Sequence, residues 1–423
     1  MTTHQQRLPD LPLLTEFPVT LTTKMLAPSD IHATAAQRDA YLRYTRMGDP
    51  NADALVAMLR RFPAGHGRAM FENAVENGIT AVEDPPRELV EFFAHIDTVP
   101  YWVDVGQLDH ACRVIGRTGL IGFASLSMVG LMGGYLASRV VKTLVRTGDL
   151  ERMAPRRIAE TTTWFTQVTS QGGLDRFAPG FKATIRVRLM HAMVRAGMTR
   201  REDWNFTAWD HPINQSTLAG TTMLFAIAHM AGSQALGIHF SRHDKDAIYH
   251  LWRYTGYLLG VDQEILPTND RDYWRMLWLQ THHEFGHPDQ DSIRLAQAFL
   301  RAIGPAVAGD STNMASRFGR NVVSGIACAY ARSVLGRRNA DFLEIPDSAA
   351  FHVVVIVFAV IITALEYPRR LLPGATGWAE KHGQRSRLRL MKRMMLSQSG
   401  QLNFHRHDHL GDYVQRAAAD TVA

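Results

Sequence analysis

Helical periodicity is the feature that most constrains the fold of this chain. Apolar residues recur every three to four positions through most of the sequence, whereas the alternating runs typical of half-buried strands are scarce. Clear examples are Ala52–Phe62, Pro86–Ile96, Val105–Thr118 and Asp244–Leu259. The sequence therefore predicts an all-α protein. A buried strand remains an alternative only for the β-branched run Val353–Ile362, because a fully apolar helix and a buried strand give the same pattern.

Turn residues separate these helices without dividing the chain into several domains. No low-complexity linker, internal repeat or sharp change of composition is present. With 423 residues, 46% of them hydrophobic, the chain can bury a large core without disulfides or a structural metal. Closely spaced prolines mark residues 1–30 as an amino-terminal arm. We predict one large helical domain at residues 31–372, followed by a basic carboxy-terminal helix and tail at residues 373–423.

Three apolar stretches invite comparison with membrane spans: Thr118–Ser138, His211–Ser241 and Phe351–Leu365. The first is interrupted by glycines, and the second carries histidines that are costly in lipid. The third has about fifteen residues, fewer than the ~20 that a bilayer requires. We predict that all three are central helices of a soluble core, with a peripheral membrane contact left open. Because the amino terminus shows no basic cluster followed by an apolar segment, the expected location is the cytoplasm.

Composition argues against several classes of site. The cysteines, Cys112 and Cys328, lie far apart, so neither a disulfide framework nor a cysteine-built metal centre is expected. The net charge of +6 is modest for this length, and the basic residues are not interleaved with aromatic ones, so no nucleic-acid partner is expected. The sequence also lacks the G-x-S-x-G motif of many hydrolases.

One short motif is typical of zinc peptidases. His283-Glu284-Phe285-Gly286-His287 matches H-E-x-x-H, in which two histidines one helical turn apart bind zinc and the glutamate activates water. Its context is poor, because Pro288 follows directly and no further histidine stands at the metzincin spacing. We therefore expect a helix end that leads into a polar loop. A zinc hydrolase built on His283, Glu284 and His287 ranks third among the functional hypotheses.

The first candidate site lies on the predicted helix Phe181–Ala196. Arg188, His191 and Arg195 stand at positions i, i+3 and i+7 and therefore share one face of this helix. A neutral imidazole that faces inward can bind haem iron, and arginines one turn away can pair with the propionate carboxylates. The alternative is that these residues form the polar stripe of an ordinary amphipathic surface helix.

The second candidate site lies on the preceding predicted helix, Pro155–Ser170. Arg157, Glu160, Thr161 and Trp164 share a face at i, i+3, i+4 and i+7. Together they offer a cation, a carboxylate base, a hydroxyl donor and an aromatic wall above a reactive metal centre. The alternative is a surface Arg–Glu pair that stabilises the helix by only ~0.2–0.5 kcal/mol.

These two segments resemble a known family when they are read together. Arg157–Thr161 (RIAET) and Val187–His191 (VRLMH), with Arg195 one turn later, are similar to the haem-binding core of the rubber oxygenases, also called latex-clearing proteins. Further stretches look like signature segments of the wider superfamily, which includes enzymes that cleave prenyl side chains: Gly48–Asp53, Val99–Asp104, Pro212–Gln215 and Gly260–Pro267. The resemblance runs in order from about Gly48 to Arg320.

The resemblance implies an all-helical fold with a globin-like core around one haem b. It implies that His191 is the proximal iron ligand and that Arg188 and Arg195 lie near the propionates. On the distal side it places Arg157 and Thr161 as catalytic residues.

Two departures from the rubber-cleaving members affect the predicted active site. Glu160 stands where those members have a lysine, and no counterpart of their upstream glutamate is found in Val140–Leu150. Either Glu160 serves as the catalytic base, or the pocket carries out a different oxidation. Arg317 or Arg320 is a further candidate for a propionate contact.

The resulting hypothesis is a haem-dependent oxygenase that activates O₂ for oxygenation or oxidative cleavage of a C=C bond. Its substrate would be an apolar small molecule, for example an isoprenoid, and Arg157, Glu160 and Thr161 would shape the distal pocket. The alternative is a haem-binding oxygen sensor or carrier without turnover. These hypotheses differ in their observables: the oxygenase consumes O₂ with an alkene, the sensor only binds O₂, and the zinc hydrolase shows no Soret band.

Overall fold

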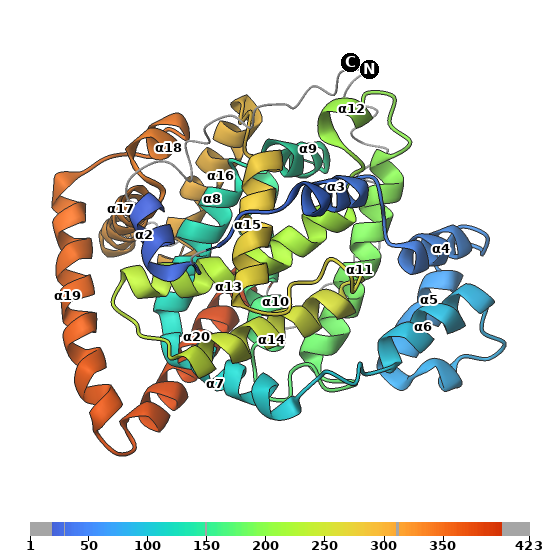
Figure 1. Ribbon diagram of the computed structural model, residues 1–423, viewed down its shortest axis with the longest axis horizontal. Helices are drawn as coiled ribbons and strands as arrows, with labels where there is room; N and C mark the ends of the chain where they lie inside the picture. Colours follow the sequence, from blue (N-terminus) through green and yellow to red (C-terminus); the bar gives the residue numbers. More distant parts are fainter. Residues whose placement is uncertain (1–18, 29, 149, 310–312, 400–423) are drawn as a thin grey trace.

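Helices form all of the regular structure in the part of the chain that is described (Figure 1). The computed structural model describes residues 19–28, 30–148, 150–309 and 313–399, and within these ranges it contains no strand. The all-α prediction is therefore confirmed. Val353–Ile362, for which a strand was the alternative, lies inside a helix. Most of the predicted arm at residues 1–30 lies outside the described residues.

The helices follow one another through mostly short connections. The first half of the chain contains α2 (Val19–Leu26), α3 (Ala35–Tyr44), α4 (Pro50–Leu59), α5 (His66–Asn77), the 3-10 helix η1 (Ile79–Ala81), α6 (Arg87–Asp97), α7 (Val105–Ser125), the π-helix η2 (Leu126–Leu131), α8 (Met132–Gly134), α9 (Ser138–Arg146) and α10 (Leu150–Val168). The second half contains α11 (Pro179–Met198), α12 (Phe206–Trp209), α13 (Gln215–Ala235), α14 (Arg242–Leu258), α15 (Asp270–Glu284), α16 (Gln290–Ala308), α17 (Met314–Leu335), α18 (Arg337–Phe342), α19 (Ala349–Leu371) and α20 (Ala375–Ser399).

Side-chain caps account for several of the helix starts. Asp49 caps α4 and Asp104 caps α7, and in each case the carboxylate accepts a backbone N–H of the first turn. Asn214 does the same for α13, and Ser241 forms a capping box with Asp244 at the start of α14. Each cap satisfies donors that a helix cannot pair internally.

The core is built around α7 and α13. α7 packs against α13, α14 and α20, while α13 also contacts α15 and η2. α10 packs against α11, α16 and α20. In Figure 1, α4, α5 and α6 form a group at one end of the molecule, and α19 forms the opposite edge. The predicted central helices at Thr118–Ser138 and His211–Ser241 correspond to α7 to α8 and to α13, whose residues are largely buried.

The third apolar stretch does not behave as predicted. Two helical segments are long and apolar enough to cross a membrane: Val105–Gly134, which is 61% buried, and Ala349–Leu371, which is only 17% buried. The prediction that Phe351–Leu365 is a central core helix is therefore wrong. This apolar stretch belongs to α19, which lies at an outer edge of the molecule.

Glycines allow α20 to cross α7 at backbone contact. A Cβ at Gly383 would lie 2.1 Å from the carbonyl oxygen of Gly116, which is closer than any side chain can approach. Gly119 adopts a φ of +55° inside α7 and so kinks this helix at the crossing. The buried Arg387 of α20 donates a hydrogen bond to Thr169 Oγ1. α20 is thus part of the packed core, and the domain division at residue 373 stays a prediction.

Candidate active site

A large, mostly apolar cavity of about 980 Å³ lies among α9, α10, α11, α13 and η2. Small-molecule sites typically measure about 300–1,000 Å³, so this cavity can hold a ligand of cofactor size. Aromatic rings form one wall, where Trp164, Phe225 and Trp252 all contact one another with ring centroids 4.8–5.9 Å apart. The cavity is therefore adapted to an apolar ligand with a small number of polar contacts.

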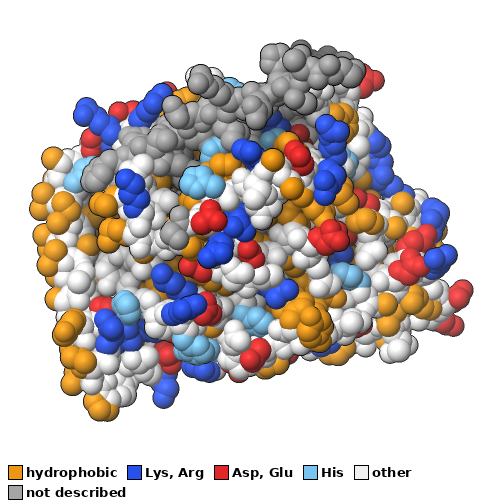
Figure 2. Space-filling view, in the orientation of Figure 1, with side chains coloured by type: hydrophobic (Ala, Val, Ile, Leu, Met, Phe, Trp, Pro, Cys, Tyr) orange, Lys and Arg blue, Asp and Glu red, His pale blue; other side chains and the backbone are white. Residues whose placement is uncertain are grey.

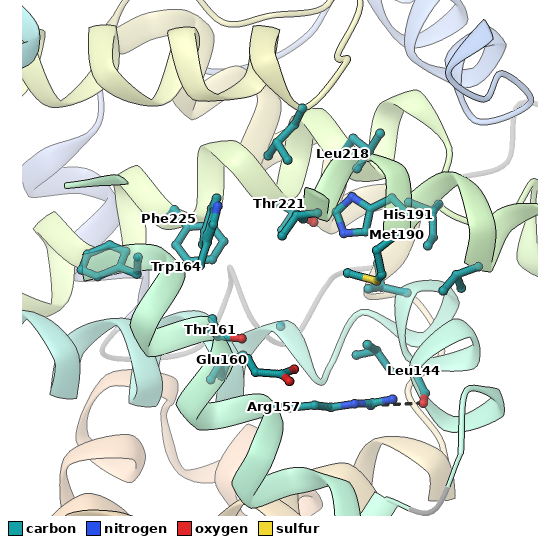
Figure 3. A pocket seen from close by; sticks show the side chains of 18 of the residues that line it. Leu144, Arg157, Glu160, Thr161, Trp164, Met190, His191, Leu218, Thr221 and Phe225 are labelled. Atoms are coloured by element: carbon teal, nitrogen blue, oxygen red, sulfur yellow. Dashed lines mark hydrogen bonds between the residues drawn. The ribbon is translucent and has the colours of Figure 1, made fainter. Parts of the chain in front are cut away.

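His191 projects from α11 toward this cavity (Figure 3). Its Nδ1 is buried and has no hydrogen-bond partner within the described residues. Burial and the nearby charge of Arg195 lower the pKa of His191 to about 4, so the ring is neutral at neutral pH. A neutral imidazole beside a cavity, with a ring nitrogen free of hydrogen bonds to the described residues, is in the form that binds a transition metal. The alternative of a solvated polar stripe is wrong, because α11 is enclosed on this face.

Arg188 and Arg195 lie on the same helix but do not reach the cavity. Arg188 donates to both carboxylate oxygens of Asp49, with N–O distances of 2.6 and 2.9 Å. Arg195 donates from Nε and Nη2 to Asp53 and from Nη1 to the carbonyl of Ile213. Each arginine is 2% exposed, and neither lines the cavity. In this structure their guanidinium groups bind Asp49, the N-cap of α4, and Asp53 of α4, and their predicted contact with propionates stays a prediction.

A buried polar network extends these two ion pairs. The side-chain amide of Gln215 donates to the carbonyls of Gly48 and Gly260, and its oxygen accepts the N–H of Asp262. A Cβ at Gly260 would lie 2.5 Å from Arg188 Nε, so only glycine leaves room for the Arg188–Asp49 pair. Three of the signature segments, Gly48–Asp53, Pro212–Gln215 and Gly260–Pro267, thus meet here. We call this set of contacts the α11 bracket, because it fixes the helix that carries His191.

The α10 residues face His191 across the cavity. Figure 3 shows Arg157, Glu160 and Thr161 on the side opposite His191, and all three line the cavity. Arg157 donates to Thr147 Oγ1 at 2.6 Å and to the carbonyl of Leu144 at 3.4 Å, and burial lowers the pKa of its guanidinium. The structure therefore brings four of the predicted site residues to one cavity: His191 of α11 and Arg157, Glu160 and Thr161 of α10.

Glu160 contacts Arg156 as well as the cavity. Its carboxylate accepts a hydrogen bond from Arg156 Nε at 2.8 Å. No carboxylate of α9 lines the cavity, since this helix contributes Arg139, Val140, Thr143 and Leu144. Among the acidic residues that do, Glu72 and Glu76 belong to α5 and bind Arg186. Glu160 is the carboxylate that α10 presents opposite His191.

The turn between α10 and α11 sets the separation of these two groups. A Cβ at Gly173 would lie 2.1 Å from the Gln167 carbonyl, and one at Gly180 would lie 2.5 Å from the Gly173 carbonyl. The two glycines therefore allow the end of α10 to touch the start of α11. Farther along, the Trp164 indole donates to Thr184 Oγ1 at 3.1 Å, which joins the helices inside the core.

Arg139 is a basic residue on the cavity wall that the sequence did not predict. Its Nη1 donates to Asp210 Oδ2 at 2.6 Å and lies 2.8 Å from His283 Nε2. Nothing in the local pattern of α9 distinguishes Arg139 from a surface arginine, because its partners are distant in sequence. Arg317 and Arg320, the loose propionate candidates, belong to α17 and do not line the cavity.

The zinc-peptidase arrangement is not formed. α15 ends at Glu284, and His287 lies exposed beyond the helix, so the predicted helix end is confirmed. Asp210, His283 and Glu284 do place ligand atoms within 4.8 Å of one another. The Arg139 guanidinium, however, already contacts Asp210 and His283, and it supplies the positive charge there. The second histidine of a zincin pair is absent from this group.

The fold and site define an all-helical protein with a large apolar cavity that presents a neutral histidine opposite an arginine, a carboxylate and a hydroxyl. Among solved structures, latex clearing protein LCP in the closed state matches with a TM-score of 0.61. The match covers 81% of this chain and 91% of that chain at 19% identity, so it shows a shared fold.

Residues 113–364 match the family model described as ER-bound oxygenase mpaB/B′/Rubber oxygenase, catalytic domain. The chain belongs to this oxygenase family, which confirms the resemblance found in the sequence. Rubber oxygenase of Streptomyces sp. (strain K30) is 25% identical over 231 residues, which are 52% of this chain and 54% of that relative. The similarity thus spans about half the length of that curated relative.

Proposed function

We propose that this protein is a haem b-dependent oxygenase that acts on a C=C bond of an apolar, isoprenoid-like small molecule, with cleavage or oxygenation as the reaction. One observation carries the proposal: the neutral, unpartnered imidazole of His191 points into a cavity of about 980 Å³ with apolar walls. Membership of the oxygenase family supports it. Haem bound there supplies the iron at which O₂ is activated.

The residues at the cavity fit haem b. His191 would hold the iron, and the α11 bracket keeps this imidazole from shifting, since Arg188 and Arg195 bind α4 on either side of it. Arg157 is a basic group on the cavity wall that could pair with a propionate, because its guanidinium donates to the neutral oxygen atoms of Thr147 and Leu144. Arg139 also lines the cavity, but it already forms an ion pair with Asp210.

The distal residues have separate roles in this proposal. Thr161 presents a hydroxyl that can donate a hydrogen bond, and Arg157 holds a positive charge on the same wall of the cavity, where Thr147 Oγ1 fixes its guanidinium. Glu160 supplies a carboxylate that can accept a proton. Trp164 and Phe225 bind the apolar part of the substrate and exclude water from it.

Absorption spectra of the purified protein test the cofactor. We expect a Soret band in the wild type and its loss in His191→Ala. His229→Ala is the control, because His229 is likewise neutral and has a buried, unpartnered Nδ1, but does not line the cavity. Haem retained in His191→Ala, or lost equally in both variants, would remove His191 from the proximal position.

Oxygen uptake with an isoprenoid alkene tests the reaction. The oxygenase proposal predicts O₂ consumption that depends on the alkene and yields oxygenated products, with carbonyl groups if the bond is cleaved. Reversible O₂ binding without product would favour the sensor.

A further inference from the structure

α19 presents an unusually apolar outer surface. Side chains along its exposed side are 49–65% exposed: Val353, Ile356, Val357, Val360, Ile361 and Leu365. In Figure 1 this helix forms one edge of the molecule, and in Figure 2 hydrophobic side chains run along the same edge. From Ala349 to Leu365 the helix contains no lysine, arginine, aspartate or glutamate. An exposed apolar face of this length marks an interaction surface.

The exposed apolar face of α19 is wider than the contact that one partner helix could cover. At 100° per residue, the apolar side chains that extend from Ile356 through Val353 to Phe358 cover about 200° of the circumference. A helix that packs on one partner needs an apolar stripe about 100° wide. The width of the α19 face therefore favours immersion in an apolar phase over docking to another helix.

The remaining face of α19 is fixed along the body of the protein. The Phe351 ring occupies the space beside Gly325 of α17, and Thr363 lies against Gly237. Near the carboxy end, Glu366 accepts the backbone N–H of His239 at 3.1 Å and forms an ion pair with Arg369. If α19 crossed the bilayer, the parts of the protein packed along it would have to enter the hydrocarbon region. The helix can therefore enter a membrane only with its axis parallel to the bilayer plane.

The residues that follow the apolar face favour an anionic lipid surface. Tyr367 and Trp378, which are 69% and 63% exposed, are of the types enriched where hydrocarbon meets water. Exposed basic residues follow at the end of α19, with Arg370, and along α20, which has the single acidic residue Glu380: Lys381, Arg385, Arg389, Lys392 and Arg393. Such a charge excess attracts anionic headgroups.

We propose that α19 lies in the plane of a phospholipid bilayer, with its outer face in the acyl-chain boundary and the basic residues of α20 near anionic headgroups. This is the arrangement of an interfacial helix that is anchored on the surface of a membrane without spanning it. The proposal is independent of the oxygenase reaction, since it concerns the edge of the molecule and not the cavity.

Vesicle flotation with the full-length protein tests this proposal. We expect binding to vesicles of phosphatidylcholine with phosphatidylglycerol that exceeds binding to phosphatidylcholine alone. The triple variant Val353→Gln, Ile356→Gln, Val360→Gln should bind at least about tenfold more weakly, because apolar contact area is lost. These side chains are exposed, so the fold should persist, as circular dichroism would show.

A matched control removes three exposed apolar side chains elsewhere: Val99→Gln, Val105→Gln and Met314→Gln, at positions 59%, 62% and 86% exposed. This control should bind vesicles like the wild type. A second variant, Lys381→Gln, Arg385→Gln, Arg389→Gln, should reduce the preference for anionic vesicles and the sensitivity to salt.

Several outcomes would overturn the proposal. The first is that the wild type binds neither kind of vesicle. The second is that the α19 variant and its control lose vesicle binding equally. The third is that the basic variant loses vesicle binding while the α19 variant binds like the wild type. Sedimentation velocity adds another: a dimer that the α19 substitutions convert to a monomer, with vesicle binding unchanged, would make this face an interface between two copies.

Discussion

Replacing Glu284 by glutamine should change how the stability of the protein depends on pH. Glu284 is fully buried at the end of α15, and within the described residues no side chain donates a hydrogen bond to either of its carboxylate oxygens. Burial, as the largest cause, raises the pKa of this carboxyl from 4.5 to about 7, against the opposing charges of His283 and Arg139. Glutamine has nearly the same shape as the protonated side chain but cannot ionise.

The size of the effect follows from proton linkage. Because the pKa is raised in the folded state, the protonated carboxyl favours folding fully below the unfolded pKa, and this contribution is lost as pH rises through about 7. A rise from 4.5 to about 7 corresponds to about 3 kcal/mol, at ~1.4 kcal/mol per pKa unit. The wild type should lose this amount between about pH 5 and pH 8. Glu284→Gln should not.

Urea unfolding followed by far-UV circular dichroism measures this difference. We expect the free energy of unfolding of Glu284→Gln, relative to the wild type, to rise by up to about 3 kcal/mol between about pH 5 and pH 8. Glu91→Gln is the control, because the Glu91 side chain is 52% exposed on α6 and should show no such rise. Parallel pH curves for the wild type and Glu284→Gln would refute the assignment of a protonated buried carboxyl.

Three further predictions concern the site and its supports. Glu160→Gln should retain haem but slow alkene-dependent O₂ uptake at least about tenfold, by the loss of a base; unchanged uptake would remove Glu160 from the mechanism. Asp49→Ala should lower stability by about 3–5 kcal/mol, because Arg188 is left buried without its partner; a calorimetric scan showing no change in melting temperature would contradict the α11 bracket. Gly383→Ala should destabilise the α7–α20 crossing, whereas Gly377→Ala in the same helix has open space and should not, and equal unfolding midpoints for the two variants would contradict the crossing.

Local patterns predicted the helices and much less of the tertiary structure. Spacing placed Phe181–Ala196 and Val105–Thr118 inside α11 and α7, because periodicity reports which side of a helix is buried. Pro155 was taken as a helix start, but α10 begins at Leu150 and continues through this residue. The apolar composition of α19 could not reveal that its outer side faces away from the body, since a sequence does not state what covers a helix.

The candidate site was predicted in part for the same reason. His191 and the α10 residues could be named because their spacing places each set on one helix face and because the two segments together resemble the haem-binding core of the rubber oxygenases. The partners of Arg188 and Arg195 could not, because Asp49 and Asp53 lie more than a hundred positions away in the sequence. Charge and spacing alone do not distinguish an arginine that meets a cofactor from one that meets a carboxylate.

The α11 bracket also limits what shared motifs can reveal about chemistry. The segments of the bracket hold the helix that carries His191. They are separate in the chain from α10, whose residues line the opposite side of the cavity. Substitutions at Glu160 or Thr161 during evolution could therefore leave the position of His191 unchanged. Chains recognised by these motifs would share a scaffold yet could differ in the molecule they transform, and a substrate should be inferred from the opposing helix.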